Sequence, residues 1–341
     1  MVRQGDGKPI PRSALETESF SPLLHARMNR FLYLSAILLL FPGVSCSQDP
    51  TQETPFTPNI DAERLLLHVE ILASDEYKGR RSGTEGGHMA QAYVQQKFED
   101  MGLQPACSES WVQNFPFQAR DGSQQQGANL IGLIPGTGGA DGSIVISAHY
   151  DHLGERDGVI YNGADDNASG TAALIELARE LLAERPVHNV VIAAFDAEEL
   201  GLVGAQAFVR SDCFAASDVR MNINMDMVSR NEAGELWASG TYHHPFLKPL
   251  LEGVARPAGL TVSFGHDQPT EGYNDWTGAS DHAPFHSAGV PFVYFGVEDH
   301  AGYHNPSDDF EAITPDFFVA AVSWIHDALR AADAALDGFP D

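Results

Sequence analysis

The stretch VVIAAFDAEELG, residues 190–201, joins six consecutive apolar residues to three carboxylates. A short continuous apolar run is typical of a strand buried on both faces, as in the parallel sheets of α/β proteins. Asp196, Glu198 and Glu199 follow at once, and neighbouring like charges raise the free energy of the folded chain unless positive charge lies near them. The stretch therefore predicts a buried strand whose carboxyl end lies beside a cation.

Strand and helix patterns alternate along most of the chain. Strands are predicted over residues 128–136, 143–151, 190–195, 221–226, 235–239 and 291–296. Helical periodicity is found in residues 60–74, 85–101, 170–184 and 315–335. Because the strands are apolar on both faces and alternate with helices, we expect an α/β fold, a three-layer α/β/α sandwich with a mixed, largely parallel central sheet.

The N-terminal part of the chain is predicted to lie outside this fold. The apolar run FLYLSAILLLF, residues 31–41, follows Arg30 and is too short for a comfortable transmembrane helix, which is typical of a signal-peptide core. We therefore expect an over-extended gene start at 1–27, a signal peptide at 28–46, a polar linker at 47–59 and a single domain at 60–341. No transmembrane span is predicted in the mature chain.

The chain contains three cysteines, and their positions bear on its compartment. Cys46 follows the tripeptide GVS, which resembles a bacterial lipoprotein cleavage box except that Gly stands where Leu is usual. A lipid anchor at Cys46 and plain secretion both remain open, and both predict an exported protein, periplasmic or extracellular. An oxidising compartment permits a disulfide between Cys107 and Cys213, whereas two unpaired buried thiols are the alternative.

The charge balance argues against one class of partner. The chain carries 47 Asp and Glu residues against 20 Lys and Arg residues, a formal net charge of −27. Because a surface this acidic repels phosphate backbones, we do not expect nucleic-acid binding.

Imidazole and carboxylate side chains gather where the predicted strands end. The strand ends carry His149, Tyr150, Asp151 and His152, then Glu198 and Glu199, then Asp226, and finally Tyr303 and His304 beyond the last strand. Ligands of open α/β sheets bind at the carboxyl ends of strands. A single Asp at such an end is often a helix cap, but several ends of this kind together predict an ion-binding site.

The residue types narrow the choice of ion. Imidazole with carboxylate and no thiolate suits Zn²⁺, Mn²⁺ or Co²⁺ better than Ca²⁺. The sequence has no HExxH motif, which excludes a single-helix zinc protease. The abundance of carboxylates fits two metal ions, as in two-metal hydrolases.

Two segments of the sequence allow more than one interpretation. Asp165, Asp166 or Asn167 in the turn GADDNASG, residues 163–170, could cap the helix that follows. The polar stretch GHDQPTEGYNDWTG, residues 265–278, is either a mobile surface segment or a wall of a binding site.

Five motifs occur in an order that resembles a known family. HYDHLG, GADDNASG, FDAEELGLVGA, NMDM and YHNPSD resemble the co-catalytic di-zinc aminopeptidases of the bacterial leucyl aminopeptidase type, as does LASDEYKGRRSGTEG at 72–86. Glutaminyl cyclases share the fold of that family. The resemblance runs from about Ile60 to the C-terminus and implies a zinc-exopeptidase fold with one zinc peptidase domain over 60–341.

The resemblance also implies a metal-binding role for several of these residues. His149 and Asp226 would hold one Zn²⁺ ion, Glu199 and His304 would hold the other, and Asp166 would bridge both. It therefore implies two zinc ions per chain.

The reaction and the substrate are implied in the same way. Glu198 would act as general base in hydrolysis by a hydroxide that bridges the two Zn²⁺ ions. Asp151 would accept the second N–H of the His149 imidazole, and Tyr303 would hydrogen-bond the developing oxyanion. The substrates would be peptides with a free N-terminus, whose amine lies near the metal-binding carboxylates.

Two alternative functions are also considered. Asp281, in SDHAPFHSAGVP at 280–291, matches a motif whose Asp transfers protons in glutaminyl cyclases, which use one catalytic zinc; a helix cap is the plainer explanation. A non-catalytic binding module is disfavoured because every ligand position and the Glu198 base are present. Residues without an expected metal role are Asp196, a structural loop acid, and His243, His244, His282, His286 and His300.

Overall fold

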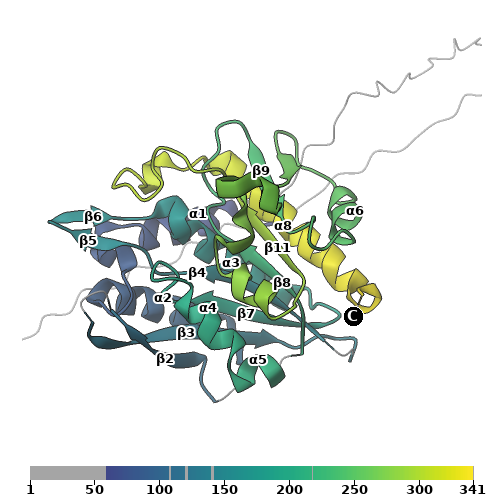
Figure 1. Ribbon diagram of the computed structural model, residues 1–341, viewed down its shortest axis with the longest axis horizontal. Helices are drawn as coiled ribbons and strands as arrows, with labels where there is room; N and C mark the ends of the chain where they lie inside the picture. Colours follow the sequence, from purple (N-terminus) through teal and green to yellow (C-terminus); the bar gives the residue numbers. More distant parts are fainter. Residues whose placement is uncertain (1–58, 107–108, 120–121, 140–141, 217, 341) are drawn as a thin grey trace, which may run out of the picture. The chain divides into compact units, whose positions relative to one another are not determined.

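The structure is a computed structural model that describes residues 59–106, 109–119, 122–139, 142–216 and 218–340. The expected gene start and signal peptide, all of the linker except Asn59, and Cys46 and Cys107 lie outside the described residues. The described residues belong to a single structural unit, in which a central sheet is covered by helices on both faces (Figure 1).

The strands of the described chain are short and follow the sequence predictions closely. They are β1 Gln104–Pro105, β2 Val112–Gln118, β3 Gln124–Ile134, β4 Ser143–His149, β5 Gly154–Arg156, β6 Val159–Tyr161, β7 Asn189–Phe195, β8 Val219–Met225, β9 Glu235–Ser239, β10 Thr261–Phe264 and β11 Phe292–Gly296. All six predicted strands are present. The others are short or, like β2 with its Pro116, carry a residue that weakens a strand pattern.

The four predicted helices are also present. The α-helices are α1 Ala62–Leu72, α2 Glu85–Met101, α3 Gly170–Ala183, α4 Val203–Val209, α5 Asp212–Ala216, α6 Leu247–Glu252, α7 His282–Ser287 and α8 Pro315–Ala335. In the described residues, no helix is long and apolar enough to cross a membrane.

The main sheet is parallel in its centre and antiparallel towards its sides. Its strands lie in the order β1-β3-β7-β4-β8-β11-β9-β10, with β2 paired to β3. Strands β7, β4, β8 and β11 are mutually parallel, whereas β3 and β9 run antiparallel to their neighbours in this central group. The predicted fold class, a mixed sheet between two helical layers, is confirmed.

The burial of strand β7 on both faces explains why its sequence is a continuous apolar run. Val190, Ile192 and Ala194 belong to the large apolar core that helices α1, α2, α3 and α8 cover. Val191, Ala193 and Phe195 point to the opposite face, where they pack with residues of α4, α5 and α7. Because successive side chains of a strand alternate between faces, burial of both faces leaves no position for a polar residue.

A buried arginine connects the segments that surround the end of β4. Arg80 is 0% exposed and donates hydrogen bonds to four main-chain carbonyls, those of Leu72, Tyr150, Asn162 and Gly163. Burial lowers the pKa of Arg80 to about 10, although nearby carboxylates raise it in part. The guanidinium therefore stays charged at neutral pH. Arg80 therefore joins helix α1 and the turn before α3 to the residue that follows β4.

Replacement of Arg80 by Met is expected to lower the free energy of unfolding by about 3–5 kcal/mol, because it leaves buried carbonyls without donors. Urea denaturation followed by circular dichroism measures this change. The matched control is Arg81→Met, since Arg81 is only half-buried and donates one bond of 3.3 Å to Leu153 O. The Arg81→Met control is expected to lower the free energy of unfolding by less than about 1 kcal/mol. An equally small effect of Arg80→Met would contradict the structural role assigned to Arg80.

Candidate active site

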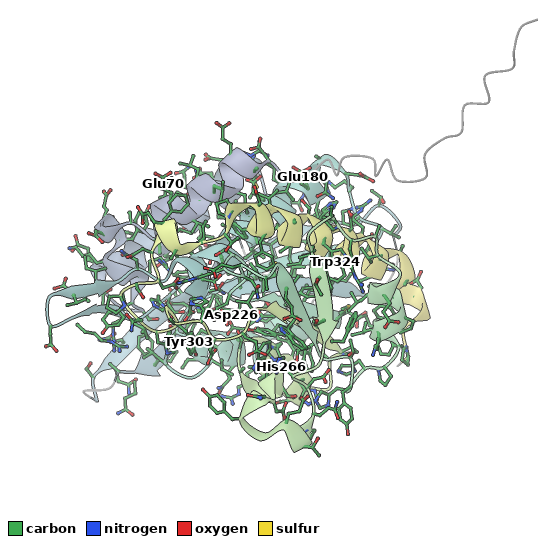
Figure 2. All side chains as sticks on the ribbon, turned by 90° about the horizontal axis from the view of Figure 1, so that it is seen from above. Glu70, Glu180, Asp226, His266, Tyr303 and Trp324 are labelled. Atoms are coloured by element: carbon green, nitrogen blue, oxygen red, sulfur yellow. The ribbon has the colours of Figure 1, made fainter. Side chains whose placement is uncertain are left out.

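The predicted site residues meet at one edge of the sheet because four parallel strands end there. His149 is the last residue of β4, and Asp226 follows directly on β8. Glu199 follows β7, and His304 lies in the loop beyond β11. Figure 2 shows Asp226 and Tyr303 close together, and both line the same cleft.

The first cluster of ligand atoms comes from His149, Asp166 and Asp226. One ligand atom from each residue lies within 4.8 Å of the other two. His149 Nε2 is 3.3 Å from Asp226 Oδ1 and 3.6 Å from Asp166 Oδ1. The structure thus brings together the residues predicted to hold one metal ion.

The second cluster is built around the other oxygen of Asp166. His304 Nε2 lies 3.2 Å from Asp166 Oδ2 and 3.4 Å from Glu199 Oε2. Asp166 therefore turns Oδ1 to the first cluster and Oδ2 to the second, which is the arrangement required of a bridging carboxylate. The two clusters together contain all five residues that were predicted as metal ligands.

His152 also lies in the second cluster, although no metal-binding role was predicted for it. Its Nδ1 is 2.8 Å from Glu199 Oε1 and 3.7 Å from Asp166 Oδ2, and the three residues could hold a metal ion. The only sequence signal was its place in the HYDH motif. Because the chain leaves β4 at His149, the alternation of a strand does not predict where His152 points.

The buried polar atoms of the two clusters test whether a cation fits between them. His149 Nε2, Asp226 Oδ1, Glu199 Oε1 and both ring nitrogens of His152 are buried without a hydrogen-bond partner. Burial of such atoms is costly unless a ligand satisfies them. Imidazole nitrogens and carboxylate oxygens are the donors that Zn²⁺ takes in proteins, so the residues present fit zinc.

The main chain at Asp166 is held by hydrogen bonds that leave its side chain free for the site. Asp166 lies in the helical turn η2, Ala164–Ser169. The carboxylate of Asp308 accepts hydrogen bonds from the main-chain N–H groups of Asp165 and Asp166, both at 3.0 Å. Asn167 Oδ1 accepts a hydrogen bond at 2.8 Å from the main-chain N–H of Gly170, the first residue of helix α3.

Asp165 has neither a capping role nor a place in a cluster. Its Oδ1 accepts from the main-chain N–H of Ser229 at 2.7 Å and from the Ser229 hydroxyl at 2.8 Å. Its Oδ2 lies 2.9 Å from His300 Nε2. This contact gives His300 a structural partner outside the two clusters, in agreement with its expected lack of a metal role.

The predicted hydrogen bond between the Asp151 carboxylate and His149 is replaced by another arrangement. His149 Nδ1 is 3.1 Å from the main-chain oxygen of Asp151 but 3.7 Å from its carboxylate. The Asp151 carboxylate instead accepts from Glu198 N at 3.1 Å and from the Ser82 hydroxyl at 3.0 Å. Asp151 therefore contacts Glu198 through its carboxylate and His149 through its main-chain oxygen.

Asp196, the first carboxylate after β7, has structural contacts only. It accepts hydrogen bonds from the Ser82 hydroxyl at 2.7 Å, Ala197 N at 2.8 Å and Ala128 N at 3.0 Å. Burial raises the pKa of Asp196 to about 7. These contacts attach the end of β7 to the segment before α2 and to β3.

A cleft of about 570 Å³ opens over the two clusters. Its lining includes Glu198, Tyr303 and the metal-site carboxylates. The stretch 265–278 forms one wall through Tyr273, Asp275 and Trp276, which answers the open question about that segment. Residues 240–246 are not among the described residues that line it; His243 instead contacts Thr277 Oγ1 at 2.9 Å.

Burial raises the pKa values of two acids in the cleft. The Glu198 carboxyl has a pKa well above its usual range, because its burial outweighs the nearby His149. Burial likewise raises the pKa of the Tyr303 phenol, so its O–H stays protonated and able to donate a hydrogen bond. The Tyr303 ring stacks on His304, with ring centroids 4.0 Å apart.

Two remaining predictions concern residues away from the clusters. His282 Nε2 lies 2.9 Å from the main-chain oxygen of Trp276, and in the described residues it belongs to no ligand cluster. Cys213 is disulfide-bonded. Its predicted pairing with Cys107 falls on a residue outside the described chain.

Comparison with known sequences agrees with this geometry. The model of peptidase family M28 matches residues 129–328. This chain belongs to peptidase family M28. It is similar to aminopeptidase YwaD of Bacillus subtilis (strain 168), with 31% identity over an alignment of 213 residues that covers 57% of this chain. The aligned part covers 42% of the length of YwaD, so this M28 chain spans about two-fifths of that relative.

Solved structures share the fold of this M28 peptidase chain. A zinc aminopeptidase from Bacillus subtilis has a TM-score of 0.62 at 18% identity, covering 81% of this chain and 96% of that one. A glutaminyl cyclase from Porphyromonas gingivalis has a TM-score of 0.64 at 18% identity, covering 80% and 99%. The fold is therefore common to two kinds of enzyme and does not by itself choose between them.

Proposed function

We propose that this M28 chain is a zinc-dependent aminopeptidase that removes N-terminal residues from peptides and binds one Zn²⁺ ion at each ligand cluster. One observation carries the proposal: Asp166 offers its two carboxylate oxygens to two separate sets of ligands. Bound there, two Zn²⁺ ions would polarise the substrate carbonyl and acidify a water molecule.

Glu198 is the proposed general base. It lines the cleft but belongs to neither ligand cluster in the described residues. Its main-chain N–H is bound by Asp151, and its Oε2 lies 3.9 Å from His149 Nε2. The positive charge of two bound Zn²⁺ ions would offset the burial that raises the pKa of Glu198. The ionised carboxylate could then take the proton of the attacking water and deliver it to the leaving amine. Tyr303 would donate its O–H to the developing oxyanion.

The free N-terminus of the substrate is the proposed recognition element. Besides the metal-site carboxylates, the cleft is lined by Asp275 and Asp299. This concentration of negative charge favours an ammonium or amine group. The wall that Tyr273 and Trp276 contribute closes one side of the cleft, which supports cleavage at a chain end.

The test is a zinc count paired with a panel of substrates. We expect two zinc equivalents per chain and turnover of Leu-, Ala- or Lys-p-nitroanilide. Removal of zinc by a chelator should abolish turnover, and added Zn²⁺ should restore it. N-acetylated peptides are expected to be poor substrates because they lack the amine; their efficient cleavage would contradict recognition of the free N-terminus.

A glutaminyl cyclase is the second candidate, and Asp281 is the observation that favours it. The expected helix cap is absent: Asp281 precedes α7 but its side chain makes no capping hydrogen bond. The carboxylate is fully buried, neither oxygen has a hydrogen-bond partner, and burial raises its pKa to about 8. Such a group can carry a proton at neutral pH. Cyclisation of Gln-naphthylamide with one zinc per chain would favour this function over hydrolysis.

We further propose that the protein is exported. The support is the signal-peptide pattern at 28–46 and the disulfide-bonded Cys213, since disulfides persist in oxidising compartments. N-terminal sequencing and mass determination of the mature protein test this. A mature chain that begins at an acylated Cys46 would establish the lipid anchor, and one that begins upstream of Met28 would contradict the expected gene start.

A further inference from the structure

His152 is a second imidazole at the carboxylates of the second cluster. It is 1% exposed, and its ring centroid lies 6.1 Å from that of His304. The two rings approach different oxygens of Glu199: His304 Nε2 is near Oε2, and His152 Nδ1 is near Oε1. Two histidines therefore lie against the Glu199 carboxylate, where the motifs imply one.

The contact between His152 and Glu199 lacks the geometry of a hydrogen bond. His152 Nδ1 and Glu199 Oε1 are 2.8 Å apart, yet each is a buried atom without a hydrogen-bond partner. An N–H group must point along the contact to make such a bond. An imidazole lone pair and a carboxylate oxygen at this separation repel each other unless a cation lies beside both.

The turn around Gly163 prevents the His152 ring from moving aside. A Cβ atom at Gly163 would lie 2.5 Å from two atoms of the His152 ring, and Gly163 has a φ of +59°. The main chain of the turn thus packs directly against the imidazole, and glycine permits both the conformation and the close approach. The ring packed in this way has its Nδ1 towards the cluster.

We propose that His152 Nδ1 is a ligand of the metal ion held by Asp166, Glu199 and His304. The inference rests on the proposed function, because it assumes a metal at that cluster. Donor atoms that bind one Zn²⁺ ion at about 2 Å lie roughly 3 Å from one another. The separations of His152 Nδ1 from the two carboxylates, 2.8 and 3.7 Å, are near that value.

The two metal positions then differ in their ligands. The His149 cluster provides three protein ligands, and the Glu199 cluster provides four with His152 included. Sites with four protein ligands are typically closed, whereas sites with three keep a position open for water or substrate. We therefore expect the ion at the Glu199 cluster to be held more tightly and to be the last that a chelator removes.

The experiment compares the full-length wild type with His152→Asn and His152→Ala. Asparagine retains an N–H donor for Glu199 but is a poor zinc ligand, so it separates ligation from a hydrogen-bonding role. Zinc affinity is measured for both equivalents with metal buffers, and Co²⁺-loaded protein is followed by visible absorption. His188→Asn is the matched control, since His188 is a buried imidazole 3.0 Å from the Asp333 carboxylate and belongs to neither ligand cluster of the described residues.

For both His152 variants we expect one zinc equivalent to weaken by more than about 100-fold, beyond the range of groups that only support a ligand. The Co²⁺ absorption bands should change, and the control should match the wild type in both measurements. Affinities of both equivalents within about 100-fold of wild type in His152→Asn would overturn the proposal. Wild-type protein that binds two zinc ions but turns over no aminoacyl substrate would contradict the proposed aminopeptidase function. It would not contradict the proposed ligand role of His152.

Discussion

Replacement of Glu198 by Ala is expected to lower kcat by about 10²- to 10⁴-fold, the usual contribution of a general base. Both zinc equivalents should remain, because Glu198 belongs to neither ligand cluster in the described residues. The local chain should also persist, since Asp151 binds the main-chain N–H of residue 198 and not its side chain. Turnover of Leu-p-nitroanilide and the zinc content of the same preparation are the measurements.

Glu198→Gln is the matched variant for this prediction. It preserves the size of the side chain and removes only the ability to accept the proton, so its loss should be similar to that of Ala. KM should change little in both variants if Glu198 acts mainly on the transition state. Near-normal turnover by a fully zinc-loaded Glu198→Ala protein would exclude Glu198 as the base.

Replacement of Asp166 by Ala has the largest expected effect on metal binding. Asp166 contributes one oxygen to each cluster, so both zinc equivalents should be weakened at once and turnover lost with them. The turn itself should stay in place, because Asp308 binds the main-chain N–H of Asp166. Zinc content after dialysis and the rise of the unfolding temperature on adding Zn²⁺ are the measurements, and that rise should disappear.

Asp226→Ala is the control that tests the bridging role. Asp226 belongs to the first cluster only, so this variant should lose one zinc equivalent and keep the other. A loss confined to one equivalent in Asp166→Ala as well would show that the two clusters do not share this carboxylate.

The sequence alone predicted the elements and their order because their signals are local. Burial of both faces of β7 appears directly as six apolar residues in a row, and the amphipathic pattern of α8 marks its full length, Pro315–Ala335. The residues proposed as ligands, except His152, were implied by the resemblance of the five motifs to a known family. The family match over residues 129–328 confirms what the order of those motifs implied.

Contacts between distant segments were decided only by the tertiary structure. Nothing local indicates that the carboxylate of Asp151 binds Glu198 N, or that the side chain of Asn167, and not that of an acidic neighbour, binds Gly170 N at the start of α3. The wall formed by residues 265–278 likewise depends on where that loop returns to the sheet edge. Such contacts depend on distances between residues far apart in the chain, which periodicity does not encode.

His152 shows this limit most clearly. The sequence places it three residues after His149, but the strand ends between them, so its direction cannot be inferred from alternation. Packing against the turn at Gly163 turns its Nδ1 towards Glu199, a residue that follows another strand. The sequence therefore determined which residues supply the chemistry at the strand ends, and the packing of loops around those ends decided which atoms face one another.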